Sequence, residues 1–264
     1  MKLKKKVKVM IVVSIVASLL SGCGFGETKI EYERLVKALD EGDMKTVMSA
    51  SDDGYAYVTQ RGIYSTFEQK EDGEHSKTIY QTSTGVYNIK DKSLYGNTTQ
   101  EITSEVDDKN YKEEVNYSTN IMYKNEKVQS PDSNLDVSYV NLIVDRLKGI
   151  GKLKIKPGDD IKKFDQPNSV GYRLTESEFQ SIINGKLKIN YDEYDGSTIS
   201  LSFDSAKNPK QILQLSIDID YKTKNEDGKI VKNMVQIITY FDKKQNNIHD
   251  GKKEYLNYKE DYTK

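Results

Sequence analysis

The spacing of apolar residues along this chain changes several times, and each change predicts a different element. An uncharged run, residues 9–20, follows eight residues that carry five lysines. Further on, apolar residues recur every three or four positions from Tyr32 to Leu39, which is typical of an amphipathic helix. After Glu41-Gly42 interrupts this run, Asp43 is placed to cap a second short helix.

From about residue 55 to 128 the apolar period becomes two, which predicts β-strands. Three long strands are expected over residues 76–89, 92–106 and 111–123, separated by polar turns. In the last of them polar side chains occupy one face, so the sheet is expected to be antiparallel and solvated on one side. The other face carries Tyr111, Val115, Tyr117, Ile121 and Tyr123. Such tyrosines either fill a core, or line a cavity or bind the face of a sugar or peptide.

The middle of the chain returns to a helical period. Val137, Val140, Val144 and Leu147 form a stripe that predicts a helix ended by Gly149 or Gly151. A short strand and turn are then expected over residues 151–160. Thr175 and Glu178 form a capping-box pattern, which predicts a helix closed by Gly185.

The last part reads as a second antiparallel meander. Strands over residues 187–194 and 197–203 are expected to join in a hairpin at Asp195-Gly196. Residues 232–242 are apolar on both faces, which predicts a central strand. Between them, residues 212–222 alternate, with Asp218 and Asp220 on the wet face. The other face of that strand carries Leu213, Leu215, Ile217, Ile219 and Tyr221.

These elements predict an α+β fold: one large curved antiparallel sheet, half-barrel-like, with a few helices covering its apolar face. The expected domain spans residues 29–264. The tail, residues 252–264, is either a short helix or a frayed end.

Composition narrows the class of protein. The chain has 264 residues, 19 tyrosines, no tryptophan and one cysteine, so it can form no intramolecular disulfide. Without the five lysines at its start, 35 basic residues face 41 acidic ones, a net charge of −6. A mildly acidic surface of mixed sign argues against a nucleic-acid partner.

The single cysteine follows the uncharged run. Leu20-Ser21-Gly22-Cys23 resembles the lipobox of bacterial lipoprotein precursors. The resemblance implies that residues 1–22 are a signal peptide, that Cys23 carries a diacylglyceryl group, and that residues 23–28 form a tether. The protein would then sit at the extracytoplasmic face of the cell membrane. The alternative is an incidental cysteine beside an ordinary signal peptide.

The element pattern also resembles the half-barrel of periplasmic lipoprotein carriers and of related Gram-positive and mycobacterial lipoproteins. The resemblance is carried by the helix over residues 30–39, the strand-to-helix step over 172–185, and the closing strands over 214–223 and 235–242. It implies an apolar cavity under a curved sheet, lidded by helices. The composition, rich in lysine, asparagine and tyrosine, resembles that of a Bacillus-type surface lipoprotein.

No motif of enzymatic or metal chemistry appears. Each of the two histidines, His75 and His249, lies in a turn-like composition and is interpreted as a solvated loop residue. Residues 225–228 copy the middle of a calcium loop, but the final ligand position is Met234, which favours a plain hairpin turn. The sequence therefore predicts no cofactor, no metal site and no enzyme.

The expected function is non-enzymatic binding of an apolar or amphiphilic ligand between the sheet and its helices. The alternative is a surface or immunity-type lipoprotein that binds an envelope protein and has a filled core instead of a cavity. The residues expected to face the ligand are Leu213, Leu215, Ile217, Ile219 and Tyr221 on the sheet, and Leu35 and Val144 on the helices.

Overall fold

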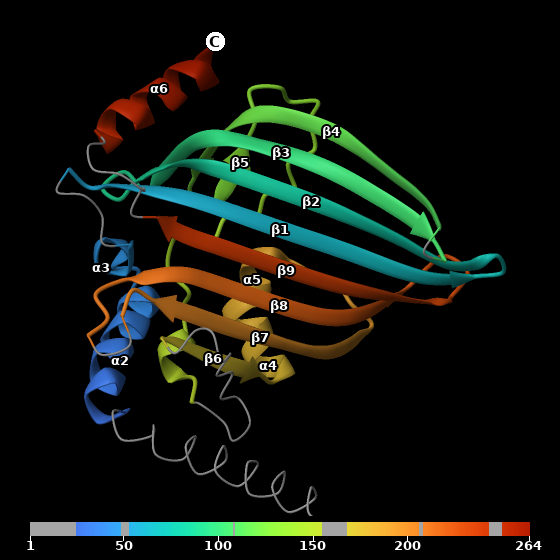
Figure 1. Ribbon diagram of the computed structural model, residues 1–264, viewed down its shortest axis with the longest axis horizontal. Helices are drawn as coiled ribbons and strands as arrows, with labels where there is room; N and C mark the ends of the chain where they lie inside the picture. Colours follow the sequence, from blue (N-terminus) through green and yellow to red (C-terminus); the bar gives the residue numbers. More distant parts are fainter. Residues whose placement is uncertain (1–24, 49–52, 108, 155–167, 206–207, 243–249) are drawn as a thin grey trace, which may run out of the picture.

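A computed structural model describes residues 25–48, 53–107, 109–154, 168–205, 208–242 and 250–264. Long strands dominate it, and the helices are short (Figure 1). The elements are α2 (Phe25–Glu41), α3 (Met44–Met48), β1 (Tyr55–Lys70), β2 (Gly73–Asn88), β3 (Ser93–Val106), β4 (Lys109–Lys124), β5 (Lys127–Gln129), the 3₁₀ turn η2 (Ile150–Lys152), β6 (Ser169–Leu174), α4 (Glu176–Phe179), the π-helical turn η3 (Gln180–Asn184), α5 (Gly185–Leu187), β7 (Glu193–Phe203), β8 (Ile212–Lys224), β9 (Ile230–Asp242) and α6 (Gly251–Thr263).

All nine strands form one antiparallel sheet in the order β5-β4-β3-β2-β1-β9-β8-β7-β6. Two meanders are therefore joined where β1 pairs with β9. The strand that was predicted to be central, β9, has a neighbour on each side. The two edge strands, β5 and β6, do not pair with each other, so the sheet is open. A large antiparallel sheet with a few helices is confirmed.

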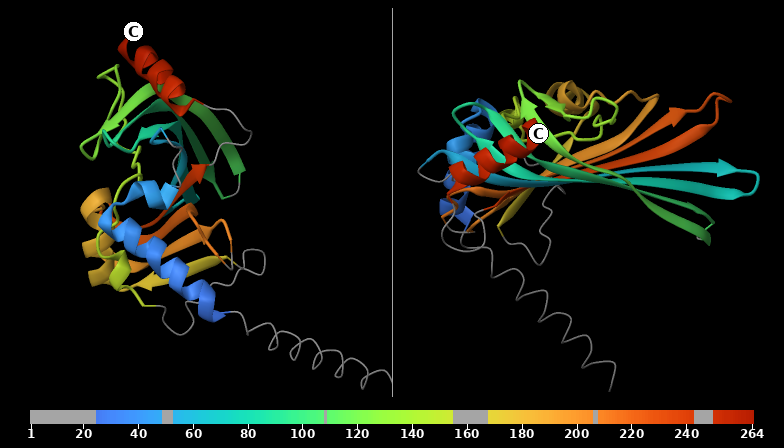
Figure 2. Two further views of the ribbon diagram at one scale, coloured as in Figure 1. Left: turned by 90° about the vertical axis from the view of Figure 1, so that its left-hand side faces the viewer. Right: turned by 90° about the horizontal axis from the view of Figure 1, so that it is seen from above.

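The cover of the sheet is divided between its two faces. The inner face, which includes Val58 and Ile217, packs against α2, α3, α4 and residues 131–149, which we call the strap. The outer face receives α6, where the Tyr255 hydroxyl lies 2.7 Å from that of Ser93. Figure 2 shows the strands running past the helices at the end away from α2, which we call the distal end. The tail predicted to be either a helix or a frayed end is thus helical.

The prediction that residues of the strap form a helix is wrong. Residues 131–149 cross the inner face in an irregular, extended path with short turns. Val140, Leu142, Ile143, Val144 and Leu147 are all buried. Apolar side chains at 142, 143 and 144 point to more than one side, which an extended segment between sheet and helices can bury. Gly149 adopts a φ of 99°, a left-handed conformation that glycine adopts at little cost.

Helix starts were predicted better than helix ends. Asp43 caps α3 by accepting the Thr46 amide at 3.2 Å, as predicted. Thr175 and Glu178 form the expected capping box of α4. However, α2 begins at Phe25 and not at residue 30, so residues 25–28 of the predicted tether are helical. The helix of residues 176–187 also continues through Gly185 and ends at Lys188, which has a φ of 55°.

Bulges account for the errors in the strands. Asp195-Gly196 makes no hairpin, because β7 continues through it with a shift of register between Tyr194 and Gly196. A second shift opposite Ser202 and Phe203 leaves Leu213 unpaired and 37% exposed, so it does not share the inner face with Leu215. Such an extra residue reverses the alternation of a strand. The register of the partner strand sets the position of a bulge, and the strand's own pattern does not show it.

A register shift also explains the error in the predicted face of β4. Tyr117, Ile121 and Tyr123 face the core, but a shift between Gln100 and Glu101 leaves Tyr111 and Val115 exposed on the outer face. The stripe predicted from residues 111–123 is therefore half core and half surface.

Other predictions have mixed outcomes. Residues 225–228 form the expected hairpin turn, closed by a 2.9 Å bond from the Gly228 amide to the Asn225 carbonyl. Instead of a strand, residues 150–152 form a 3₁₀ turn. His75 lies in β2, 2.8 Å from Asp72, and not in a free loop. Residues 20–23, the segment 155–160 and His249 lie outside the described residues.

Candidate ligand groove beside the strap

Five of the seven predicted ligand-facing residues are sealed inside the core. Leu215, Ile217 and Ile219 of β8 are at most 1% exposed, and Leu35 and Val144 are fully buried. All five belong to one hydrophobic cluster. Tyr221 is half-buried at its margin. In the described part of the chain, the strap and α2 therefore occupy the space in which a ligand was expected.

Polar side chains of the inner face hold the strap in place. Gln60 of β1 is 3% exposed and donates to the Asn141 carbonyl at 2.8 Å. Its side-chain oxygen accepts the Ile143 amide at 2.9 Å. The hydroxyl groups of Tyr64 and Tyr117 donate to the carbonyls of Tyr139 and Asp136, at 2.8 and 3.0 Å. Buried polar groups of the sheet thus find their partners in the strap backbone.

The end of the strap is fastened to α2. The Leu147 amide donates to the Leu39 carbonyl at 3.0 Å. The Asp40 carboxylate accepts the amides of Gly149 and Gly151 at 2.7 and 3.1 Å. α2 and the strap are hydrogen-bonded to each other at this end, and the strap is hydrogen-bonded to the sheet in its middle. The two segments therefore form one cover over the inner face.

A groove of about 610 Å³ remains open on the β5 side of the strap, and we call it the strap groove. Three segments form its walls: β5 with the turn before it, residues 137–143 of the strap, and residues 185–188 at the end of α5. The volume lies within the range of about 300–1,000 Å³ that is usual for small-molecule sites.

The lining of the strap groove combines apolar and cationic groups. Its apolar side chains are Val128, Val137, Val140, Leu142, Ile143 and Leu187. Its cations are Lys127 and Lys188, which are exposed, and Lys186, which is partly buried. Glu126 is the one acidic residue in the lining. A molecule with an apolar body and an anionic group matches this arrangement, because each part meets a complementary surface.

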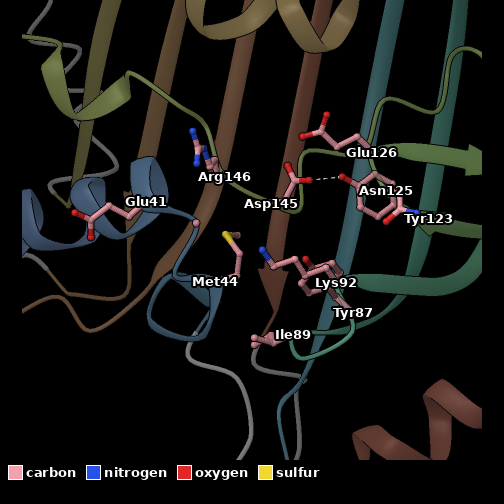
Figure 3. Close-up of a pocket in the computed structure, with 11 residues that line it drawn as sticks. Glu41, Met44, Tyr87, Ile89, Lys92, Tyr123, Asn125, Glu126, Asp145 and Arg146 are labelled. Atoms are coloured by element: carbon pink, nitrogen blue, oxygen red, sulfur yellow. Dashed lines mark hydrogen bonds between the residues drawn. The ribbon is translucent and has the colours of Figure 1, made fainter.

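A smaller pocket of about 220 Å³, the end pocket, adjoins the groove and shares Tyr123, Asn125 and Glu126 with it (Figure 3). Figure 3 shows Tyr87 and Tyr123 on its strand side, and Asp145 and Arg146 on its strap side. Glu41 and Met44 approach from α2 and α3. The lining is therefore mixed in charge, with two cations, Lys92 and Arg146, and three carboxylates.

One ion pair lies between the two hollows. Lys186 lines the strap groove and donates to Asp145, which lines the end pocket, at 2.7 Å. Both side chains are about one-fifth exposed, 21% and 19%. Lys186 also lies 3.4 Å from Glu126, and the Tyr123 hydroxyl donates to Asp145. Burial first, and then the Asp145 charge, raises the pKa of Tyr123, so this phenol stays protonated and keeps donating.

Sequence reasoning missed these residues for a local reason. Asp145 stood in a predicted surface helix, and Lys186 stood just beyond the predicted end of another helix. Neither position carries a motif. In the described residues, no group of three or more histidine, cysteine, aspartate and glutamate side chains is arranged to hold a metal ion. A search of the described helices also finds none that is long and apolar enough to cross a membrane.

Comparisons with known proteins give a partial match. Residues 18–115 match the family model of DUF3952, a domain of unknown function. That range starts before the Leu20–Cys23 box and extends from α2 into β4. The solved structure of a DUF1329 family protein from Desulfovibrio piger is 10% identical, covers 83% of this chain and 95% of its own, and has a TM-score of 0.24. This similarity is too low to carry an argument. No curated protein matches the chain.

Proposed function

We propose that this protein is a bacterial lipoprotein of Gram-positive, Bacillus-like type, held at the extracytoplasmic face of the cell membrane by diacylglyceryl-Cys23. The proposal is supported by the order of a basic start, a short uncharged run and the Leu20-Ser21-Gly22-Cys23 box. Two acyl chains give stable anchoring, whereas a single chain binds a membrane only marginally.

Metabolic labelling tests the anchor. Cells that express the chain and grow with radioactive palmitate should label it, and Cys23→Ala should abolish the label and leave the chain at precursor mass. Ser21→Ala is the matched control, because alanine is also small and should keep processing intact. Equal labelling of the Cys23→Ala variant would contradict the proposal.

We further propose that the protein binds, without catalysis, an amphiphilic ligand that carries a negative charge, and that it binds this ligand in the strap groove and not under the sheet. The observation that carries this proposal is the groove itself, with its apolar wall and its lysines. The predicted residues of the inner face support it by exclusion, because they are already packed in the core. His75 of β2 pairs with Asp72 in the turn before it and does not line the groove.

Hexadecanoate and hexadecanol, which differ in the charged group, are suitable probes for titration calorimetry. We expect saturable binding of hexadecanoate, and binding of hexadecanol that is weaker by about tenfold, because one charge-assisted contact contributes about 1.5 kcal/mol. The pair of substitutions Lys127→Glu and Lys188→Glu should weaken hexadecanoate binding.

The matched control for those two substitutions is Lys112→Glu with Lys232→Glu, which changes the net charge equally at exposed sites outside the groove. It should leave the affinity unchanged. If both pairs weaken binding alike, or if hexadecanoate does not saturate, the groove is not the binding site.

A protein partner is the second candidate function, and one observation favours it. Five large apolar side chains are exposed on the outer face near the distal end: Tyr80, Tyr111, Val115, Ile230 and Met234. An exposed apolar surface of this kind marks many protein–protein contacts. Crosslinking in cells with a photoreactive residue at Met234 tests this function. A specific partner band would support it, and the absence of any band would count against it.

A further inference from the structure

The outer edge of β4 is open near the start of the strand. β5 pairs only with Met122, Tyr123 and Lys124 of this strand, so in the described sheet the five residues 111–115 have β3 on one side and no strand on the other. Residues 112–115 pair in register with β3, and the register shifts on either side of them, between Ser104 and Val106, where Tyr111 lies, and between Gln100 and Glu101. Residues 111–115 are thus a short, regularly alternating strand edge whose outward backbone groups can pair with another strand.

The side chains of this stretch are unusual for an edge. Tyr111 and Val115 are 59% and 66% exposed, the two highest values among the large apolar residues described. Both lie on the outer face with Glu113, which accepts a hydrogen bond from the Tyr111 hydroxyl at 2.9 Å. Lys112 and Glu114 lie on the opposite face. On the outer face, the two apolar side chains therefore flank Glu113, and on the other face a lysine and a glutamate do so.

We propose that residues 111–115 pair antiparallel with the same residues of a second copy of this chain. A two-fold axis perpendicular to the sheet at Glu113 keeps the faces of the two copies aligned. Tyr111 of each copy then lies opposite Val115 of the other, which covers both exposed apolar side chains. Lys112 of each copy lies opposite Glu114 of the other, which gives two ion pairs of opposite charge.

Register and charge together select this pairing. An axis at Lys112 places two lysines opposite each other and sets Tyr111 against Glu113. An axis at Glu114 places Val115 against Glu113 and forms no ion pair. The axis at Glu113 gains two apolar pairs and two ion pairs, at the cost of one repulsive contact between the two Glu113 carboxylates. The same arrangement predicts that Glu113→Gln strengthens the dimer.

The position of the edge in the molecule suits two anchored copies. The turn between β3 and β4 lies at the distal end, and α2, which follows the Cys23 segment in sequence, lies at the other end (Figure 1). The pairing therefore leaves the α2 ends of both copies free. It joins two nine-stranded sheets into one continuous sheet.

The test uses the full-length chain in cells, with Glu113→Cys introduced at the proposed axis. Mild oxidation should link the two copies, giving a band of twice the mass on a non-reducing gel. Adding Lys112→Glu sets acid against acid and should reduce the linked fraction about fivefold, since two pairs of a few tenths of a kcal/mol each become repulsive. Adding Glu114→Lys to that variant should restore the linked fraction. Lys232→Cys, which is exposed on β9, measures random collision.

A linked fraction that follows the charge reversal and its rescue supports the proposed dimer. A fraction no greater than that of Lys232→Cys, or one that ignores the charges at 112 and 114, overturns it and shows that the charged edge keeps the protein monomeric. Because the Glu113→Cys variant itself removes the central repulsion, Glu113→Gln is compared with the unchanged chain using a short amine-reactive crosslinker. A smaller dimer yield from Glu113→Gln would also overturn the proposal.

Discussion

Gln60 is the residue whose replacement should loosen the strap most selectively. Gln60→Met keeps the length of the side chain and removes all its hydrogen bonds. Three buried partners lose a bond: the Asn141 carbonyl at 2.8 Å, the Ile143 amide at 2.9 Å and the Thr239 hydroxyl at 2.9 Å. The strap then remains in contact with the sheet through apolar side chains and the two tyrosine hydroxyls.

The expected cost can be worked out from these bonds. Each net hydrogen bond contributes about 1 kcal/mol, and a buried group left without a partner costs about 1–3 kcal/mol. The Thr239 hydroxyl can rotate toward another acceptor, so the two backbone groups of the strap dominate. We expect a loss of about 3 kcal/mol in the free energy of unfolding. With a urea dependence of about 3 kcal/mol per molar, the midpoint falls by about 1 M.

Urea unfolding of the chain without residues 1–22, with Cys23→Ser, measures this loss. Gln214→Met on β8 is the matched control, because Gln214 is half-buried on the outer face and away from the strap; its effect should stay within about 0.5 kcal/mol. Hydrogen exchange adds a local readout: the Ile143 amide should exchange faster, while the Ile217 amide should not. If Gln60→Met costs less than about 1 kcal/mol and leaves Ile143 protected, the account of the strap is wrong.

Three further predictions concern the frame around the strap. Gly96→Ala would place a Cβ 2.1 Å from the Thr84 carbonyl oxygen, so it should lower the stability by about 2 kcal/mol in urea unfolding, whereas Gly185→Ala meets no atom within 4 Å and should not lower it. Burial raises the pKa of Tyr64 to about 12, above its unfolded value of 10.0. The contribution of the protonated phenol to the free energy of unfolding is therefore complete below pH 10, and it falls by about 1.4 kcal/mol per pH unit above it. Tyr64→Phe should flatten that slope in denaturation curves. Thr175→Ala removes the cap of α4 and should cost about 1 kcal/mol, while Thr175→Ser should not; equal losses would contradict the capping role.

Local chemistry was enough to predict those parts of the fold that form within short sequences. The alternation of residues 76–106 predicted β2 and β3 almost to their ends, because each strand keeps one face in the core. The capping box at Thr175 and the turn at Asn225 were predicted correctly, because their hydrogen bonds join residues only a few positions apart. The lipobox at Cys23 belongs to the same class of local signal, and its role stays a prediction.

The candidate site could not be found in this way. Its ion pair joins Asp145 of the strap to Lys186 of α5, two residues that come together only when the strap crosses the sheet. The open edge at residues 111–115 follows from the shortness of β5, a strand of three residues whose pattern is too brief to predict. The register shifts that exposed Leu213 and Val115 depend on the partner strands.

The sequence by itself determined a long-stranded antiparallel sheet, the starts of α3 and α4, and a lone cysteine in a segment that resembles a lipobox. The tertiary structure alone decided that the strap is extended and that the inner face is filled. The physical reason lies in the backbone. A helix over residues 137–147 would satisfy its own amides and carbonyls, but Gln60, Tyr64 and Tyr117 on the sheet would then lose their partners in the strap backbone. In the extended strap, backbone amides and carbonyls are hydrogen-bond partners of these side chains. The hydrogen bonds of this polar layer offset the loss of one helix.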